Sequence, residues 1–141
     1  MTPSSAPFAL DPQLAADACT VGDLTLSRVL LMKHARYPWL ILVPRRAGVR
    51  EILDLADAEQ ACLFGEITQA SRVVQTLFRP DKLNIGAIGN MVAQLHVHVV
   101  GRFKTDEAWP RPVWGAGSPT PYGAAELEER LAMLSRAFGR I

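Results

Sequence analysis

The chain has 141 residues, a formal net charge of +1, and 15 basic against 14 acidic side chains. This length predicts one domain with its own core and is too short for a β/α barrel, which takes about 250 residues. The balanced charge argues against a broad basic surface for nucleic acid. No apolar run approaches the ~20 residues of a membrane span.

Two other features bear on where the protein works. The N-terminus lacks a basic region followed by a clean apolar stretch, so we expect no signal peptide. Cys19 and Cys62 lie far apart and form no zinc spacing, which fits a reducing compartment better than a disulfide scaffold. We therefore expect a cytoplasmic protein that does not bind membranes.

The chain begins with a lead-in, residues 1–20, whose three prolines and small polar side chains predict irregular structure. Residues 24–32 form the first predicted strand and residues 39–43 the second, with Tyr37-Pro38 at their connection. The second strand is apolar throughout, so we expect it to be central in a sheet and covered on both faces.

A long helix is predicted from Asp57 to Phe78, because apolar side chains recur at helical spacing and Pro80 forbids continuation. Asp57 can cap its start and Gln60 can complete a capping box. The apolar surface of this helix is larger than one sheet face can bury, and this surplus of apolar side chains predicts a twofold homodimer. They are Leu63, Phe64, Ile67 and Val74.

Two further strands are predicted, over residues 82–87 and 95–102, with the turn signal Gly89-Asn90 between them. Their short separation favours an antiparallel hairpin. The chain then becomes rich in proline and glycine, before a last helix over residues 124–138. Together the elements predict an α+β fold: a single domain with an antiparallel β-sheet, one long central helix and a C-terminal helix.

The most informative stretch is Gln94-Leu95-His96-Val97-His98-Val99-Val100. Successive side chains of a strand point to opposite faces, so Gln94, His96 and His98 share one face. One alternative is that these histidines only make hydrogen bonds. Another is a metal site, but two imidazoles need a third and usually a fourth ligand. The chain has one other histidine, His34, and no compact cysteine or carboxylate cluster, so we expect no metal.

With its surroundings, this row resembles the signature of the histidine triad family of nucleotide hydrolases and transferases, His-φ-His-φ-His-φ-φ, where φ is apolar. Gln94 stands in place of the first histidine. The likeness includes Asn84-x-Gly86 and Gly89-Asn90 and covers about residues 20–103. The tail, residues 109–115, is similar to one bacterial branch of the family. The resemblance divides the chain into the lead-in 1–20, a catalytic domain 21–103 and an extension 104–141 packed on the same domain.

The resemblance implies that His96, the middle residue, is the nucleophile. His98 would contact the phosphate or share its proton, and Gln94 would act as a neutral donor and acceptor. An unprotonated imidazole can attack phosphorus and form a covalent phosphoramidate. The ordinary histidine pKa of about 6.5 leaves much of it neutral at cellular pH.

The same resemblance places Asn84 and Asn90 near the phosphate or ribose, although Asn90 equally suits a plain turn. Gly89, a further candidate for substrate binding, either lets a ligand approach the backbone or serves the turn. Family members commonly carry asparagine or an acidic residue for the ribose hydroxyls near the end of the strand before Pro38. Here that region carries Lys33, which would favour a phosphate.

Four more residues have open roles. Gly86 either lets a ligand approach the backbone or serves a turn. Arg102 either attracts a polyphosphate or is a solvated surface arginine. Trp109 and Trp114 either cover the site, stack on a base, or pack the tail onto the domain.

We therefore expect a nucleotide phosphohydrolase or nucleotidyl transferase that acts at an α-phosphate through a nucleotidyl-histidine intermediate, with a dinucleoside polyphosphate as a candidate substrate. No cofactor is expected beyond Mg²⁺ on the substrate phosphates. By resemblance, the homodimer pairs through the long helix and an edge strand. Two alternatives remain: a nucleotide-binding or regulatory domain that lost turnover with its first histidine, and a metal-dependent His-x-His protein.

Overall fold

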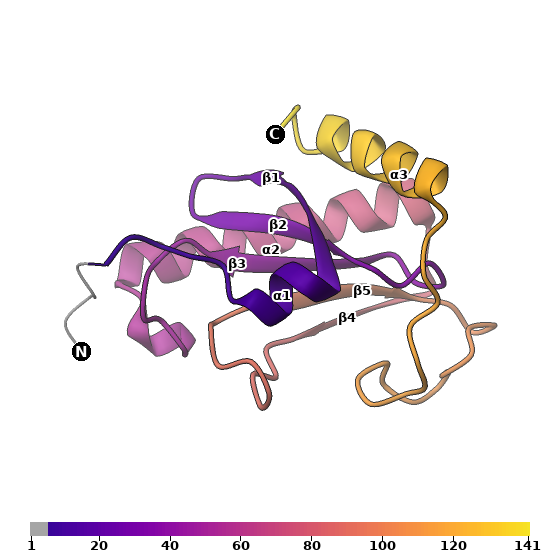
Figure 1. Ribbon diagram of the computed structural model, residues 1–141, viewed down its shortest axis with the longest axis horizontal. Coiled ribbons are helices and arrows are strands. Elements are labelled where there is room, and N and C mark those ends of the chain that lie inside the picture. The colour runs from indigo at the N-terminus through magenta and orange to yellow at the C-terminus, as the bar shows by residue number, and fades with distance from the viewer. Residues whose placement is uncertain (1–5) are drawn as a thin grey trace.

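The computed structural model describes residues 6–141 and contains a five-stranded antiparallel sheet in the order β1-β2-β3-β5-β4 (Figure 1). The α+β prediction, with its long helix and C-terminal helix, is confirmed. The strands are β1 (Ala18–Asp23), β2 (Ser27–Met32), β3 (Trp39–Pro44), β4 (Lys82–Gly86) and β5 (Val97–Arg102). The helices are α1 (Pro12–Asp17), α2 (Asp57–Phe78), α3 (Ala124–Ala137) and the short 3₁₀ helix η1 (Ile52–Asp54).

The start of the chain is more regular than its prolines predict. Residues 1–5 lie outside the described residues, but the rest of the lead-in contains α1 and the first part of β1. Asp11 caps α1 by accepting the Gln13 N–H at 2.8 Å, and Pro12 occupies the first turn, where no N–H is needed. The strand predicted over residues 24–32 is also wrong at its start, because a turn separates β1 from β2.

The long helix α2 has the predicted bounds. Its first residue is Asp57, so the capping residue is Ala56, and the Glu59 carboxylate accepts the Ala56 N–H at 3.1 Å. The predicted pairing of Asp57 with Gln60 is therefore wrong by one residue. Within residues 6–141, no helix is long and apolar enough to cross a bilayer.

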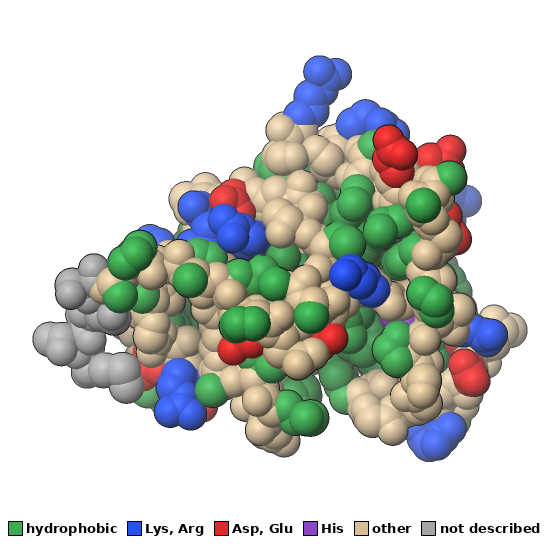
Figure 2. Space-filling model, viewed as in Figure 1, with side chains coloured by type: hydrophobic (Ala, Val, Ile, Leu, Met, Phe, Trp, Pro, Cys, Tyr) green, Lys and Arg blue, Asp and Glu red, His purple; other side chains and the backbone are tan. Residues whose placement is uncertain are grey.

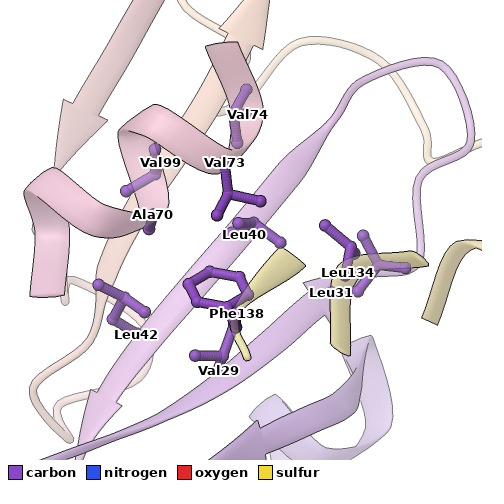
Figure 3. Close-up of a cluster of buried hydrophobic side chains, with 10 residues drawn as sticks. All are labelled: Val29, Leu31, Leu40, Leu42, Ala70, Val73, Val74, Val99, Leu134 and Phe138. Atoms are coloured by element: carbon purple, nitrogen blue, oxygen red, sulfur yellow. The ribbon is translucent and has the colours of Figure 1, made fainter. Parts of the chain in front are cut away.

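One face of the sheet packs against α2 and α3 and forms the larger part of the core (Figure 3). Most of the apolar surplus predicted for α2 is absorbed here and in an adjoining cluster, since Leu63 and Val74 are fully buried. Phe64, in contrast, is 73% exposed. The buried cluster on this face, labelled in Figure 3, comprises Val29, Leu31, Leu40, Leu42, Ala70, Val73, Val74, Val99, Leu134 and Phe138.

The opposite face of the sheet carries α1 and a second apolar cluster that includes Trp39, Ile41 and Val100. The central position predicted for β3 is confirmed, because all six of its residues are buried between the two faces. This second face also receives His98, which lies opposite Ile41 on β3. The register of β3 and β5 therefore decides which side chains surround the histidine.

A buried carboxylate ties α2 to the β1–β2 turn. Glu66 lies in the middle of α2 with 6% of its surface exposed, and its two oxygens accept the N–H groups of Leu26 and Ser27 at 2.9 and 3.0 Å. Such charge-assisted bonds are stronger than neutral ones. Glu66 thus satisfies two backbone donors that would otherwise be buried without partners.

We predict that Glu66→Ala lowers the free energy of unfolding by about 3 kcal/mol, because it leaves both N–H groups buried and unpaired. Glu66→Gln should cost less, since its amide oxygen can still accept one bond. Urea unfolding followed by circular dichroism measures the change, with the exposed α3 variant Glu129→Ala as control. A loss for Glu66→Ala no larger than the control's would contradict this role.

Candidate active site

The two histidines of the row lie on the same face of the sheet. His98 is in β5, while His96 comes just before the strand begins at Val97 rather than inside it. Their ring centroids are 5.0 Å apart and both residues are buried. The predicted pairing of these imidazoles is thus present, although the strand is shorter at its start than the predicted range 95–102.

Each ring has one nitrogen engaged by a group that determines its tautomer. Nδ1 of His96 lies 2.7 Å from the backbone oxygen of Gln94, which can only accept, so Nδ1 carries the proton. In the neutral ring, Nε2 then has the free lone pair. Nδ1 of His98 accepts the Trp39 Nε1–H at 2.9 Å, and indole can only donate. Neutral His98 therefore carries its proton on Nε2.

The two rings consequently have complementary chemistry. His96 offers a lone pair and His98 offers an N–H donor, which is the combination needed to attack a phosphorus atom and hold one of its oxygens. Burial, together with a smaller effect of the neighbouring His96, lowers the pKa of His98 from 6.5 to about 4. His98 is therefore a neutral donor at cellular pH.

Gln94 has two separate attachments. Its side-chain oxygen accepts the Asp11 N–H and its side-chain nitrogen donates to the Ala9 oxygen, both at 2.9 Å. The amide thus holds the segment before α1, while the backbone oxygen orients His96. Direct contact between the Gln94 side chain and a phosphate stays a prediction, and here both ends of that amide already have backbone partners.

A hollow of about 440 Å³ opens beside the histidines, between α1 and the segment after β5. Figure 2 shows it as a depression with hydrophobic walls and histidine colour at one side. His96 and His98 both line it, as does His34, whose Nδ1 accepts the Thr120 N–H at 3.4 Å. Its apolar and aromatic walls include Leu14, Met32, Trp39, Ile41, Val92, Val113 and Trp114.

The residues predicted to bind substrate divide into two groups. Gly89 and Asn90 line the hollow beside His96. Asn84 and Lys33 do not. The Asn84 side-chain oxygen accepts from Arg102 at 2.9 Å, and Lys33 Nζ donates to the Ala16 oxygen at the end of α1.

Both roles considered for Arg102 are wrong. Arg102 is 1% exposed, and its guanidinium makes a two-point ion pair with the Asp106 carboxylate at 2.8 and 3.0 Å. Burial raises the pKa of Asp106, but the hydrogen bonds from Arg102 and from the Phe103 and Trp109 N–H groups outweigh it, so the pKa is lowered. Arg102 therefore fixes the turn that follows β5.

The two tryptophans of the tail have different positions. Trp109 packs over the Arg102 guanidinium, with 5.6 Å from its ring centroid to Cζ. Trp114 lines the hollow and lies edge-on to His98, with centroids 5.5 Å apart. A Cβ atom at Gly86 would lie 3.3 Å from the Trp114 ring. Gly86 therefore makes room for a wall of the site, a role not among those considered from the sequence.

Two contributions to the site are not predicted from the sequence. Trp39 was expected only in the core, yet its N–H sets the tautomer of His98. Leu14 and Asp17 of α1 line the hollow, although their segment was expected to be irregular. Alternation along β3 gives a signal for Trp39, since Trp39 and Ile41 must share a face. No pattern in the sequence predicts that α1 lies over that face of the sheet.

Within residues 6–141, no group of three or more His, Cys, Asp or Glu side chains is arranged to hold a metal ion. The two histidines have hydrogen-bond partners for Nδ1 instead. The site as described is thus built from imidazoles, an indole and backbone groups.

Comparisons with known proteins found a family match and similar solved structures. A model of the HIT domain family matches residues 13–105. A histidine triad protein from Bradyrhizobium japonicum is 46% identical, with a TM-score of 0.91 over 94% of this chain and 99% of that chain. A histidine triad protein from Marinobacter aquaeolei is 42% identical, with a TM-score of 0.92 over 94% of this chain and 97% of that chain.

A curated relative gives a more distant match. A Mycobacterium tuberculosis protein named AP-4-A phosphorylase is 34% identical over 107 residues. The match covers 71% of this chain and 55% of that protein, so the chain spans about half the length of this relative.

We predict that the ring of His98 stays neutral from pH 8 to pH 5, because its folded pKa is about 4. Since that pKa lies below the ordinary 6.5, His98 adds stability that is complete above about pH 6.5 and disappears as the pH falls toward 4, by about 3 kcal/mol in all. Titration of the ring ¹H–¹³C resonances by NMR, assigned with His98→Asn, measures this. A midpoint near 6.5 in the folded protein would contradict it.

Proposed function

This chain belongs to the HIT domain family, and on that basis we propose that it transfers or hydrolyses the nucleotidyl group of a nucleotide through His96. The observation that carries the proposal is the complementary pair of tautomers: His96 with a free Nε2 and His98 with a proton on Nε2. Covalent catalysis of this kind divides one difficult displacement into two easier ones.

In the first step, His96 Nε2 attacks the α-phosphorus. An N–P bond forms while the bond from phosphorus to the leaving oxygen breaks, and the leaving group takes that electron pair. The His96 ring then carries a positive charge, which the Gln94 oxygen stabilises by accepting the Nδ1–H. His98 donates Nε2–H to a phosphoryl oxygen, where negative charge must be held.

In the second step, an acceptor oxygen attacks the same phosphorus and the N–P bond breaks, returning its electron pair to Nε2. With water as the acceptor, one water proton passes to solvent and a nucleoside monophosphate is released. With another acceptor the nucleotidyl group is transferred. His96 ends in its starting tautomer. The proposed cycle routes no step through a metal bound to the protein, and Mg²⁺ can accompany the substrate phosphates.

The hollow beside the histidines suits a nucleoside. Its walls are mainly apolar and aromatic, and such surfaces hold a base while a few polar groups orient it. The relative named AP-4-A phosphorylase supports a dinucleoside polyphosphate as the substrate and inorganic phosphate as an acceptor besides water. The two free cysteines support a cytosolic location.

We predict that His96→Ala lowers turnover of the best nucleotide substrate by at least ~10³-fold, because the nucleophile is lost. His98→Ala should keep measurable turnover, since it removes a donor and leaves the attacking nitrogen. Acid-free quenching and intact-mass spectrometry should find one nucleotidyl group per chain in the wild type and none in His96→Ala.

Urea unfolding of both variants provides the control, since a misfolded protein would also lose turnover. A folded His96→Ala variant with near-normal turnover would exclude His96 as the nucleophile. Tight nucleotide binding by a wild-type protein that turns over no adenylated or guanylated compound would favour the nucleotide-binding domain instead.

We also propose that the protein forms a twofold homodimer. Phe64 on α2 and Ile85 on the edge strand β4 are both exposed, at 73% and 49%. An edge strand with unpaired backbone groups and exposed apolar side chains is open to pairing with a second copy. The exposed Phe64 is what remains of the apolar surplus predicted for α2.

Sedimentation equilibrium at low micromolar concentration should give twice the chain mass of 15.4 kDa, and Phe64→Glu should shift the protein toward that single-chain mass because a buried charge is unfavourable. Glu128→Gln, at an exposed residue of α3, provides a control. A wild-type protein that sediments as a 15.4 kDa species would exclude a stable dimer.

A further inference from the structure

A second hollow lies on the other side of His96. Its volume is about 500 Å³, and it extends along η1 and the segment between β4 and β5. The two hollows share His96 and residues 88–90. A phosphate in contact with His96 therefore lies where they meet, and the two parts of a substrate joined at that phosphate can extend into different hollows.

The walls of the two hollows differ in chemistry. The first is mainly apolar and aromatic. The second carries the guanidinium of Arg50 and the amides of Gln60, Asn90 and Gln94. The Gln94 amide already bonds residues 9 and 11, and the Gln60 side-chain nitrogen donates to the Leu55 oxygen at 2.9 Å. The side-chain donors left for a ligand in this hollow are therefore those of Arg50 and Asn90.

Arg50 is the cation of this second hollow. The residue is exposed, and within residues 6–141 its guanidinium has no hydrogen bond or ion pair; only its backbone N–H is bonded, to Asp54. The carboxylate of Glu51 also lines the hollow and would repel a phosphate chain. Attraction of such a chain therefore depends on Arg50, whose planar donors match phosphate oxygens.

The second hollow also has apolar surface that is open to solvent. Ile52 and Ile88 line it and remain 43% and 45% exposed. Exposed apolar side chains beside amides and a cation suit a ligand with a flat apolar part and an anionic part. A nucleotide has both.

We infer that the second hollow binds the leaving half of the substrate, a nucleotide attached through its phosphate chain, and that Arg50 selects this leaving half. The inference rests on the proposed function, because it assigns the reacting phosphorus to His96. The bond broken joins the α-phosphorus to the bridging oxygen, and the leaving nucleotide keeps that oxygen and its electron pair.

The test compares kcat/KM for two substrates that share the adenylyl group: diadenosine tetraphosphate, whose leaving group is a nucleotide, and adenosine 5′-phosphoramidate, whose leaving group is ammonia. Arg50→Gln should lower kcat/KM for diadenosine tetraphosphate, relative to kcat/KM for adenosine 5′-phosphoramidate, about tenfold. This is the size expected for one lost charge-assisted contact. Arg50→Lys should restore part of it. The matched control is Arg136→Gln, an exposed arginine on α3.

A ratio unchanged in Arg50→Gln, or lowered equally in Arg136→Gln, would overturn the inference and leave the proposed function intact. The same holds for a wild-type protein that cleaves the phosphoramidate but not diadenosine tetraphosphate. Failure to cleave either compound, with no nucleotidyl group on His96, would instead overturn the proposed function and the inference with it.

Discussion

The hydrogen bond from Trp39 to His98 connects the core of this protein to its chemistry. It joins the two central strands, β3 and β5, on the face of the sheet that is not covered by α2. Because indole can only donate, the bond leaves His98 with a single possible neutral tautomer. The burial that keeps water away from this bond also lowers the pKa of His98, so the ring stays uncharged. One side chain of the core thus decides which nitrogen of His98 carries the proton.

The other histidine is controlled through the backbone. His96 lies just outside β5, where the chain is free of the strand ladder and the Gln94 oxygen can turn toward its Nδ1. The Gln94 side chain meanwhile holds the backbone at residues 9 and 11, which precede α1. A glutamine in the first place of the row therefore has a structural reason to be there. It fixes the segment from which α1 contributes a wall of the hollow.

The rest of the site depends on a buried ionic network. Arg102, Asp106 and Asn84 join β5, β4 and the turn after β5, and Trp109 covers the guanidinium. Removing one partner of such a pair would leave an uncompensated buried charge. The network determines the direction in which the chain leaves the sheet, and that path brings Trp114 against Gly86 and His98.

The sequence alone was enough to predict what depends on local periodicity. The bounds of α2, the central place of β3, the hairpin partners β4 and β5, and the shared face of His96 and His98 follow from spacing, proline and alternation. The family resemblance rested on the same short stretch. These features are local, because the residues that decide them are neighbours in the chain.

The tertiary structure alone decided which distant groups meet. Arg102 bonds Asn84 of β4, Lys33 bonds the end of α1, and Gly86 receives the ring of Trp114. Each of these contacts joins residues that are far apart in the sequence. The tautomers of the two histidines belong to the same class, since they depend on Trp39 from another strand and on the backbone path at Gln94. The physical reason is that a hydrogen bond or a packing contact is fixed by position in space, which strand register and chain path determine, whereas a sequence pattern specifies only the faces that residues share.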